Sequence, residues 1–490
     1  MSDSLSIVLA TANARYAHTA FGLRCLQANL GQYQKDTQLL EFTIQQSAHE
    51  IAESILLHEP RIAGLGVHIW NAGLMARTAE ILRRVSPATT LVCGGPEMSG
   101  SSPLSPTAQW ADYIIRGEGE EAFYSLVHDL AQGRKPEKRV IEAPPVDLEK
   151  LSDPYDLYTE QDIAHRVIYV EASRGCPYRC AFCLSGASSD LRYFSLEPFL
   201  GSMEKLIARG VRNFKFIDRT FNVDLKRMHA ILDFFLKRPE IGELHLHFEI
   251  MPDRLPPDSL ELLAAFPADV LHLEAGIQSI NQEIQKRIRR NQGIEASLSN
   301  LRWLREHSGC QIHGDLIFGL PGESPDSFAE GFNQLVTLNL QEIQLGLLKN
   351  LPGTPLSSLS DASTVYDSQP PYEILQNDHF SFSALQKMKR FAKYFDLYHN
   401  HGNFPESLAL LRTLPPSPFH VFERFSEQIW EKEKRSYGIP LVRLAEYLFR
   451  FLCDHLPDER ARIADCIEGD FRRLKGRRDH LPFLKEEDST

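Results

Sequence analysis

The chain has no concentration of positive charge, and this absence argues against one large class of functions. Its 53 Lys and Arg residues are outnumbered by 65 Asp and Glu residues, which gives a formal net charge of −12. Proteins that bind nucleic acids usually carry clustered basic residues, because they neutralise phosphates. No basic tract stands out in the sequence, so the charge gives no support for nucleic-acid binding.

Long apolar runs are also lacking. The longest, such as residues 444–452, are interrupted by charged residues and are far shorter than the roughly 20 residues that cross a bilayer. The first four residues carry no positive charge ahead of the apolar stretch, unlike a secretory signal peptide. We therefore expect no membrane span and a cytoplasmic location.

Cysteine is scarce outside one segment, and no internal repeat is visible. Five of the 8 cysteines are scattered singly along the chain: Cys25, Cys93, Cys310, Cys453 and Cys466. Such cysteines are typical of small buried apolar residues in a reducing compartment. What remains is a globular chain of 490 residues, 43% of them hydrophobic, which suits roughly three domains.

The other three cysteines lie close together, directly after a strand-like segment at residues 167–170. Cys176, Cys180 and Cys183 have the spacing C-x3-C-x2-C, on a loop that contains Gly and Pro. Three thiolates at this spacing can converge on a [4Fe–4S] cluster and leave its fourth iron open to another ligand. A structural zinc site with His165 as fourth ligand is the alternative, although such sites more often use C-x2-C or C-x4-C pairs.

Strand and helix signals alternate over residues 1–140. The expected strands are residues 6–10, 39–44, 61–67, 90–93 and 113–115. This alternation predicts a parallel sheet covered by helices on both faces. Ligands of such sheets bind at the carboxyl ends of the strands, where this chain repeatedly places glycine.

A second series of strands follows a connector rich in proline and acidic residues at 144–157. The expected strands are residues 167–170, 214–217, 244–250, 270–275, 311–318 and 342–348. Six strands with intervening helices suit a parallel partial barrel, although periodicity does not distinguish it from a flat doubly wound sheet. Beyond about residue 370 the apolar spacing becomes helical.

Taken together, the cysteine loop and the strand series resemble the cobalamin-binding-domain radical S-adenosylmethionine (SAM) enzyme family. The resemblance covers about residues 5–355 and includes the aromatic residue before the last cysteine, Phe182. It implies an α/β chain with a Rossmann-like, flavodoxin-type cobalamin-binding domain, a linker, a partial (β/α)6 radical SAM barrel and a helical C-terminal domain of unknown role. The expected boundaries are 1–140, 141–163, 164–368 and 369–490, in that order.

The resemblance also implies a set of cofactors and their contacts. Cys176, Cys180 and Cys183 carry over as the ligands of a [4Fe–4S] cluster, whose open iron chelates SAM in that family. Reduction of the cluster then cleaves SAM and frees a 5′-deoxyadenosyl radical. The implied SAM contacts are Phe182, Asp218, Glu249, Glu274, Gln278, Ile317 and Gly319.

Some of these SAM contacts have ordinary structural alternatives. The segment 218–222 departs from the Gly-Gly-Glu-like segment of the family, so Asp218 could belong to a plain strand-to-helix turn. Glu249 and Glu274 lie in apolar strands, where a carboxylate needs a partner. A salt bridge, for example to Arg254, would satisfy either of them as well as SAM would.

The cobalamin contacts rest on the first domain. The Asp-x-His-x-x-Gly pattern of cobalt-ligating domains is absent, because Tyr16 stands in place of the aspartate and Gly22 comes one residue late. His18 is therefore not assigned to cobalt. The resemblance places the corrinoid on the loops after the strands, at Asn13, Gly66, His68, Trp70, Gly94, Gly95 and Glu118.

The leading functional hypothesis is a radical SAM enzyme that uses cobalamin to methylate an unactivated carbon. We expect a small-molecule or natural-product-like substrate and an electron donor such as flavodoxin or ferredoxin. One alternative keeps the radical chemistry but ends in oxidative cyclisation or rearrangement without methyl transfer. An alternative of a different class is a non-catalytic protein that binds a corrinoid or a cluster.

Overall fold

The computed structural model describes residues 5–99, 105–187, 190–359, 361–474 and 481–484. It divides the chain into two compact units. Unit 1 consists of Met1–Glu249, Lys349–Leu359 and Asp367–Glu373. Unit 2 consists of Ile250–Leu348, Ser360–Tyr366 and Ile374–Thr490.

Unit 1 contains a six-stranded parallel sheet with the order β2-β1-β3-β4-β5-β6. Its strands are β1 (Ile7–Asn13), β2 (Thr37–Thr43), β3 (Ile62–Gly66), β4 (Thr90–Gly94), β5 (Tyr113–Gly117) and β6 (Val140–Ala143). The five strands expected from the sequence are all present. The sixth, β6, lies at the edge of the sheet, is only half-buried and was not predicted.

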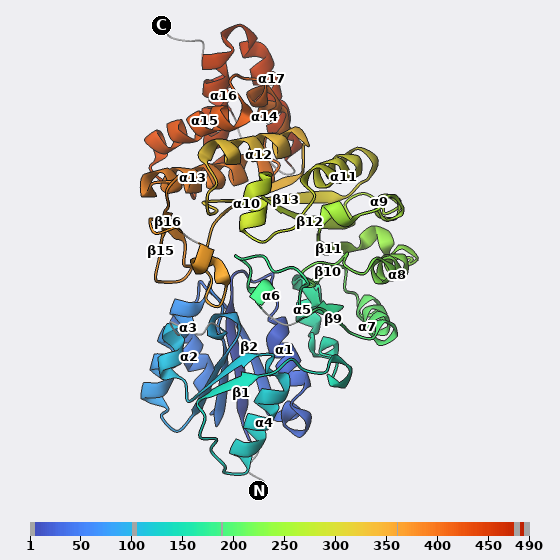
Figure 1. The fold of residues 1–490 in the computed structure, drawn as a ribbon, viewed down its shortest axis with the longest axis vertical. Helices are drawn as coiled ribbons and strands as arrows, with labels where there is room; N and C mark the ends of the chain where they lie inside the picture. Colours follow the sequence, from blue (N-terminus) through green and yellow to red (C-terminus); the bar gives the residue numbers. More distant parts are fainter. Residues whose placement is uncertain (1–4, 100–104, 188–189, 360, 475–480, 485–490) are drawn as a thin grey trace. The chain divides into compact units, whose positions relative to one another are not determined.

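Helices cover both faces of this sheet (Figure 1). They are α1 (Phe21–Ala28), α2 (Ala48–Leu56), α3 (Ala72–Val85) and α4 (Gly119–Ala131). One apolar cluster joins α2 and α3 to the sheet, and a second joins α1 and α4 to it. Burial on both faces explains why the central strands β1 and β3 read as continuous apolar runs.

The strands of the second sheet have the order β14-β13-β12-β11-β10-β7. They are β7 (Ile168–Val170), β10 (Asn213–Phe216), β11 (His245–Ile250), β12 (Leu271–Gln278), β13 (Gln311–Phe318) and β14 (Glu342–Leu347). Within unit 1, β10 pairs in parallel with β7 and β11, and within unit 2, β13 pairs in parallel with β12 and β14. The prediction of six strands is confirmed.

Helices and short elements connect these strands. In unit 1 they are α5 (Glu160–His165), β8 (Ser173–Arg174), α6 (Leu184–Ala187), β9 (Arg192–Tyr193), α7 (Leu196–Ala208) and α8 (Leu225–Leu236). In unit 2 they are α9 (Pro257–Ala264), α10 (Gln282–Arg287), α11 (Ile294–His307) and α12 (Pro325–Thr337).

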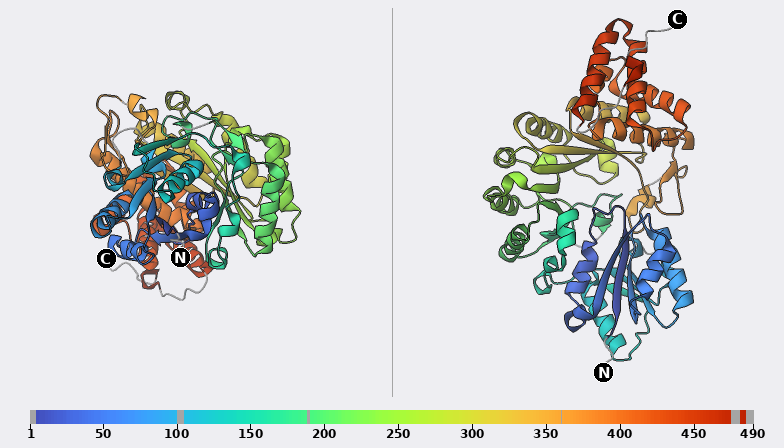
Figure 2. Two further views of the ribbon diagram at one scale, coloured as in Figure 1. Left: turned by 90° about the horizontal axis from the view of Figure 1, so that it is seen from below. Right: turned by 180° about the vertical axis from the view of Figure 1, so that it is seen from behind.

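The last part of unit 2 is helical, as the apolar spacing predicted (Figure 2). Its helices are α13 (Phe382–Phe395), α14 (Pro405–Arg412), α15 (Pro418–Glu433), α16 (Leu441–His455) and α17 (Arg460–Arg473). A two-stranded ribbon of β15 (Val365–Tyr366) and β16 (Ile374–Gln376) precedes them and was not predicted. Among the described residues, no helix has the length and apolar character that crossing a bilayer requires.

Candidate active site

The three clustered cysteines lie on one loop of unit 1, between β8 and α6. The loop leaves β8 through Gly175, whose φ of +96° a side chain would strain. Cys176 and Cys180 are only 7% and 6% exposed, and Cys183 is half-buried. The eight cysteines all fall within the described residues, and none of them forms a disulfide. No disulfide therefore occupies any of the three thiols on this loop.

Glycine also lets the end of this loop pack tightly. A Cβ atom on Gly186 would lie 2.9 Å from the carbonyl oxygen of Cys180, so a larger residue would push the loop apart. Two backbone hydrogen bonds close the turn, from Cys183 N to Cys180 O (3.2 Å) and from Gly186 N to Cys183 O (3.1 Å). Backbone hydrogen bonds and tight packing therefore hold this end of the loop.

Arg174, two residues before the first cysteine, anchors the loop through a buried ion-pair network. Its guanidinium binds both carboxylate oxygens of Glu171, at 3.1 and 2.9 Å. It also lies 2.9 Å from an oxygen of Glu120 and 3.4 Å from one of Glu118. Glu118 in addition pairs with Arg192 and accepts a hydrogen bond from the Val146 backbone. The network joins the turn after β5 to the cysteine loop.

Asp218, which follows β10, fixes the strand that leads into the same loop. Its two carboxylate oxygens accept hydrogen bonds from the backbone N–H of Ala172 (3.0 Å) and the hydroxyl of Ser173 (2.5 Å). Burial raises the pKa of Asp218 to about 7. Its neighbour Thr220 brings a hydroxyl to 3.8 Å from the Cys176 sulfur. Asp218 thus positions the loop, while the predicted contact with SAM stays a prediction.

The loops after β1 and β3 bring several of the predicted cobalamin contacts together. Asn71 accepts a hydrogen bond from the His68 N–H (2.8 Å) and donates to the carbonyl of Ala12 (2.9 Å). The rings of His68 and Trp70 stack with their centroids 4.4 Å apart. Burial lowers the pKa of His68 to about 4, so the imidazole is neutral at physiological pH. Trp70 is 48% exposed, and its contact with cobalamin stays a prediction.

Gly66, Gly94 and Gly95 lie at the ends of β3 and β4, where the sequence predicted a close approach of a ligand. Gly95 has a φ of +105°, and a Cβ atom there would lie 2.6 Å from the carbonyl oxygen of Val67. The turn therefore requires glycine at position 95, because any side chain there would clash with the Val67 carbonyl and strain the backbone. Close approach of a ligand to these glycines stays a prediction.

Two other predicted cobalamin contacts are held by protein groups. Asn13 donates to the carbonyl oxygen of His18 (2.9 Å) and to a carboxylate oxygen of Glu41 (3.1 Å). Glu118 belongs to the Arg174 network described above. The His18 Nδ1 atom lies 2.7 Å from the Tyr169 hydroxyl, so its ring is engaged with β7.

Glu249, near the end of β11, has a weak ionic partner. The Arg219 guanidinium lies 3.7 Å from its carboxylate, and the Glu249 side chain is 27% exposed. Arg254, the partner considered from the sequence, lies instead 3.5 Å from Asp253.

In unit 2, Glu274 and Gln278 both belong to β12, and a β-bulge between Gly276 and Gln278 interrupts the regular alternation of faces. Gln278 ends the strand with a φ of +68°, an uncommon conformation for a residue other than glycine. Between them the carbonyl of Gly276 accepts hydrogen bonds from Arg290 and from Gln292 (3.2 Å). The backbone here is firmly held by side chains.

Ile317 and Gly319 lie at the carboxyl end of β13. Gly319 has a φ of +87° and faces the Ile374 side chain, 3.0 Å from where its Cβ would be. Its carbonyl accepts a hydrogen bond from Asn377 (3.3 Å). Four residues on, the buried Glu323 accepts a hydrogen bond from the Ser279 hydroxyl, and burial raises its pKa to about 7.

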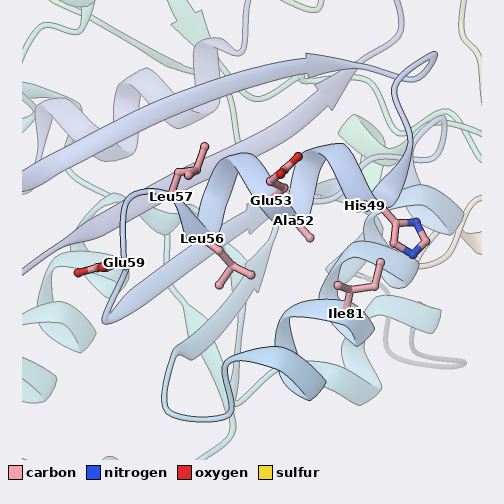
Figure 3. A pocket seen from close by; sticks show the side chains of 7 residues that line it. All are labelled: His49, Ala52, Glu53, Leu56, Leu57, Glu59 and Ile81. Carbon is pink, nitrogen blue, oxygen red and sulfur yellow. The ribbon is translucent and has the colours of Figure 1, made fainter.

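A shallow cavity of about 440 Å³ lies in unit 1, against α2 and α3 (Figure 3). It is lined by His49, Ala52, Glu53, Leu56, Leu57, Glu59 and Ile81. None of the residues predicted from the sequence to bind a cofactor lines it. We therefore do not assign it to the cofactors.

Two protein families match the two regions in which the predicted cobalamin contacts and the cysteine loop lie. The B12 binding domain family matches residues 7–127, and the Radical SAM superfamily matches residues 170–335. The chain therefore carries a B12 binding domain followed by a radical SAM domain. A third family, described as a protein of unknown function (DUF4080), matches residues 362–490 and covers the C-terminal helices.

Among curated proteins, this radical SAM protein is similar to two methyltransferases. It is 26% identical over 338 residues to 2-(S-pantetheinyl)-carbapenam-3-carboxylate methyltransferase of Streptantibioticus cattleyicolor, covering 61% of this chain and 48% of the relative. It is 26% identical over 346 residues to the cobalamin-dependent radical SAM methyltransferase TokK of Streptomyces tokunonensis, covering 62% and 49%. The chain thus spans about half the length of these relatives.

The fold of this radical SAM protein is similar to that of the methyltransferase TsrM from Kitasatospora setae, solved with cobalamin and a [4Fe–4S] cluster. The TM-score is 0.64, and the alignment covers 88% of this chain and 99% of TsrM at 17% identity. At this identity the likeness concerns the fold.

Sequence reasoning missed the ion-pair network behind the cysteine loop. Glu171 and Arg174 are three residues apart and both precede the loop, and opposite charges at this spacing are a local signal for an ion pair. Their remaining partners, Glu118 and Glu120, are more than 50 positions away in sequence, and no local pattern could have indicated them.

Proposed function

We propose that this protein is a cobalamin-dependent radical SAM methyltransferase. It cleaves SAM reductively at a [4Fe–4S] cluster, and the resulting 5′-deoxyadenosyl radical activates a carbon of a small-molecule substrate for methylation. SAM serves both as radical source and as methyl donor. The observation that carries the proposal is one loop with three cysteines at the spacing C-x3-C-x2-C, two of them nearly buried and none in a disulfide. The loop belongs to the same unit as the sheet that the B12 binding domain family matches.

The donor set of the loop fits a cluster with an open site. Three thiolates from one loop leave one iron of the cluster for SAM, and burial of Cys176 and Cys180 keeps water away from their sulfurs. When bound, the cluster supplies a low-potential electron. In this proposal Arg174 and Asp218 hold the loop in place, while Cys176, Cys180 and Cys183 are the ligands.

The remaining contacts are part of the same proposal. SAM would be bound by Phe182, Asp218, Glu249, Glu274, Gln278, Ile317 and Gly319. Cobalamin would be bound by Asn13, Gly66, His68, Trp70, Gly94, Gly95 and Glu118. The loops after β1, β3 and β4 fit the cobalamin role, since a half-exposed Trp70 stacks on a neutral His68 there.

The proposal also includes the sequence-based domain boundaries of 1–140, 164–368 and 369–490. An electron donor such as flavodoxin or ferredoxin would reduce the cluster, and we infer a cytoplasmic location from the five scattered cysteines.

Formation of S-adenosylhomocysteine separates methylation from the other functions, because only methyl transfer produces it. We expect the reduced, cluster-loaded protein to form S-adenosylhomocysteine from SAM when cobalamin is present and not when it is omitted. Methyl-labelled SAM incubated with small-molecule extracts would then mark the substrate by its mass.

The outcomes distinguish the candidate functions. Cleavage of SAM to 5′-deoxyadenosine without S-adenosylhomocysteine would favour cyclisation or rearrangement. Cobalamin binding with neither product would favour a non-catalytic binding protein. Either result would contradict the methyltransferase proposal.

A further inference from the structure

Three potential metal ligands converge on the sheet of unit 2, and none of them has been discussed so far as a cofactor contact. His272 lies on β12, His313 on β13 and Glu342 on β14. One ligand atom of each lies within 4.8 Å of those of the other two. The three residues come from three different strands, so the fold, and not local sequence, brings them together.

The strand register explains why these side chains meet. His313 is the direct partner of Glu342 across β13 and β14, and of Glu274 across β12 and β13. Direct partners in a parallel pair point to the same face of the sheet, as do residues two apart along a strand. His272 stands two residues before Glu274 and therefore shares the face of His313 and Glu342.

The distances suit a single ion. The His313 Nδ1 atom lies 3.7 Å from the Glu342 Oε2 atom. Two ligand atoms that each lie about 2.1 Å from a tetrahedral ion are roughly 3.4 Å apart. A small side-chain adjustment therefore brings both atoms within bonding distance of one metal, without movement of the strands.

The surroundings of His313 also fit a ligand role. His313 is 8% exposed, and its buried Nε2 atom lies 3.1 Å from the Asp315 Oδ1 atom. Metal-binding histidines commonly direct their second ring nitrogen toward a carboxylate, which orients the ring and strengthens the metal bond. Asp315 occupies that place, which leaves Nδ1 for the metal.

We propose that His272, His313 and Glu342 bind one divalent transition-metal ion of the zinc type. Two imidazoles and one carboxylate are a donor set of zinc and similar ions, whereas magnesium and calcium prefer oxygen ligands alone. The Glu342 side chain is 40% exposed, which provides an entry path and room for water as a fourth ligand.

The position of this metal site indicates a structural role. His272, His313 and Glu342 are the second, third and first residues of their strands, so the ion lies near the amino ends of β12, β13 and β14. Catalytic groups of parallel barrels gather at the opposite, carboxyl ends. The ion would link three neighbouring strands and would not take part in SAM chemistry.

The test is metal content in tag-free, cluster-loaded protein, in which iron occupies the cysteine loop. After incubation with Zn²⁺ and desalting, elemental analysis should find about one zinc per chain in addition to the cluster iron. The variants His313→Gln and Glu342→Gln should lose this zinc. The controls His307→Gln on α11 and Glu330→Gln on α12, which replace groups outside the site, should keep it.

A second measurement does not depend on how well the site variants fold. Co²⁺ is added to the variant C176A/C180A/C183A, whose loop offers no thiolate. We expect visible ligand-field absorption without thiolate charge-transfer bands. No retained zinc in the folded parent protein, zinc that survives both site substitutions, or a cobalt spectrum with thiolate bands would each overturn the proposal.

Discussion

Two charged side chains hold the backbone that leads into the cysteine loop, and they do so in different ways. Arg174 stays cationic and gathers three carboxylates around it. Asp218 is buried, and its pKa is raised to about 7, so it changes protonation state near neutral pH. One residue therefore contributes a fixed charge and the other a pH-dependent one.

Replacement of Asp218 should change how stability depends on pH. An unfolded aspartate has a pKa of about 4, so between pH 4 and 7 the folded protein binds a proton that the unfolded chain has lost. The contribution of Asp218 to the free energy of unfolding therefore falls as pH rises through this window. We expect Asp218→Asn to remove this fall, as measured by urea unfolding at several pH values.

The pKa of Glu323 is also raised to about 7. Because Glu323 is present in both the parent protein and the Asp218→Asn variant, the difference between their stability–pH profiles reports on Asp218 alone. Parallel pH profiles for the parent and the variant would show that Asp218 is not protonated in the folded state.

Replacement of Arg174 should be strongly destabilising. Arg174→Met leaves the buried carboxylates of Glu171 and Glu120 without their cation, which typically costs roughly 3–5 kcal/mol. The measurement is the free energy of unfolding in urea, together with the iron content after cluster reconstitution.

Arg84→Met is the matched control, because Arg84 forms an exposed ion pair with Glu80 on α3 and such pairs contribute little. Equal losses of stability in the two variants would contradict a special role for the network behind the loop.

At the scale of single residues, the sequence predicted the site residues that form a pattern over a few neighbouring positions. The spacing of Cys176, Cys180 and Cys183 is itself the pattern, so they could be identified without a structure. His272, His313 and Glu342 have no such spacing, since their proximity depends on the register of three strands. Their only sequence signal is a polar residue at alternate positions of an apolar strand.

Among the elements, the turn after β4 offers a test of backbone geometry. Gly95→Ala places a Cβ atom 2.6 Å from the Val67 carbonyl oxygen, at a φ of +105°. We expect a loss of roughly 2 kcal/mol or more in the free energy of unfolding. We also expect weaker cobalamin binding, followed by the cobalamin absorption spectrum.

Gly73→Ala on α3 is the control for this turn. A Cβ atom there meets no atom within 4 Å, and alanine favours helices over glycine, so stability should be unchanged or slightly higher. A Gly95→Ala protein as stable as the parent would show that the turn can relax.

The elements that the sequence predicted are those buried on both faces, such as β1 and β3, because burial makes them continuous apolar runs. The elements it missed are short and lie at edges. The half-buried β6 mixes Val140 and Ile141 with Glu142, and β15 has only two residues. Pairing with a neighbour, and not composition, makes such segments strands.

At the scale of the whole molecule, the chain combines two α/β sheets with a helical C-terminal region. The B12-binding sheet and the cysteine loop both belong to unit 1, while Glu274, Gln278 and Gly319 belong to unit 2. Alternation of strands and helices predicted both sheets. Sequence periodicity carries no information on the arrangement of the two units.

The central claim is that the cysteine loop holds a cluster that cleaves SAM. The most direct measurement is the yield of 5′-deoxyadenosine from anaerobically reconstituted, reduced protein with SAM. We expect the product from the parent and from the control Cys466→Ala, whose cysteine lies on α17, and a loss of at least a hundredfold in Cys180→Ala. Undiminished 5′-deoxyadenosine from Cys180→Ala, or none from the cluster-loaded parent, would contradict the account.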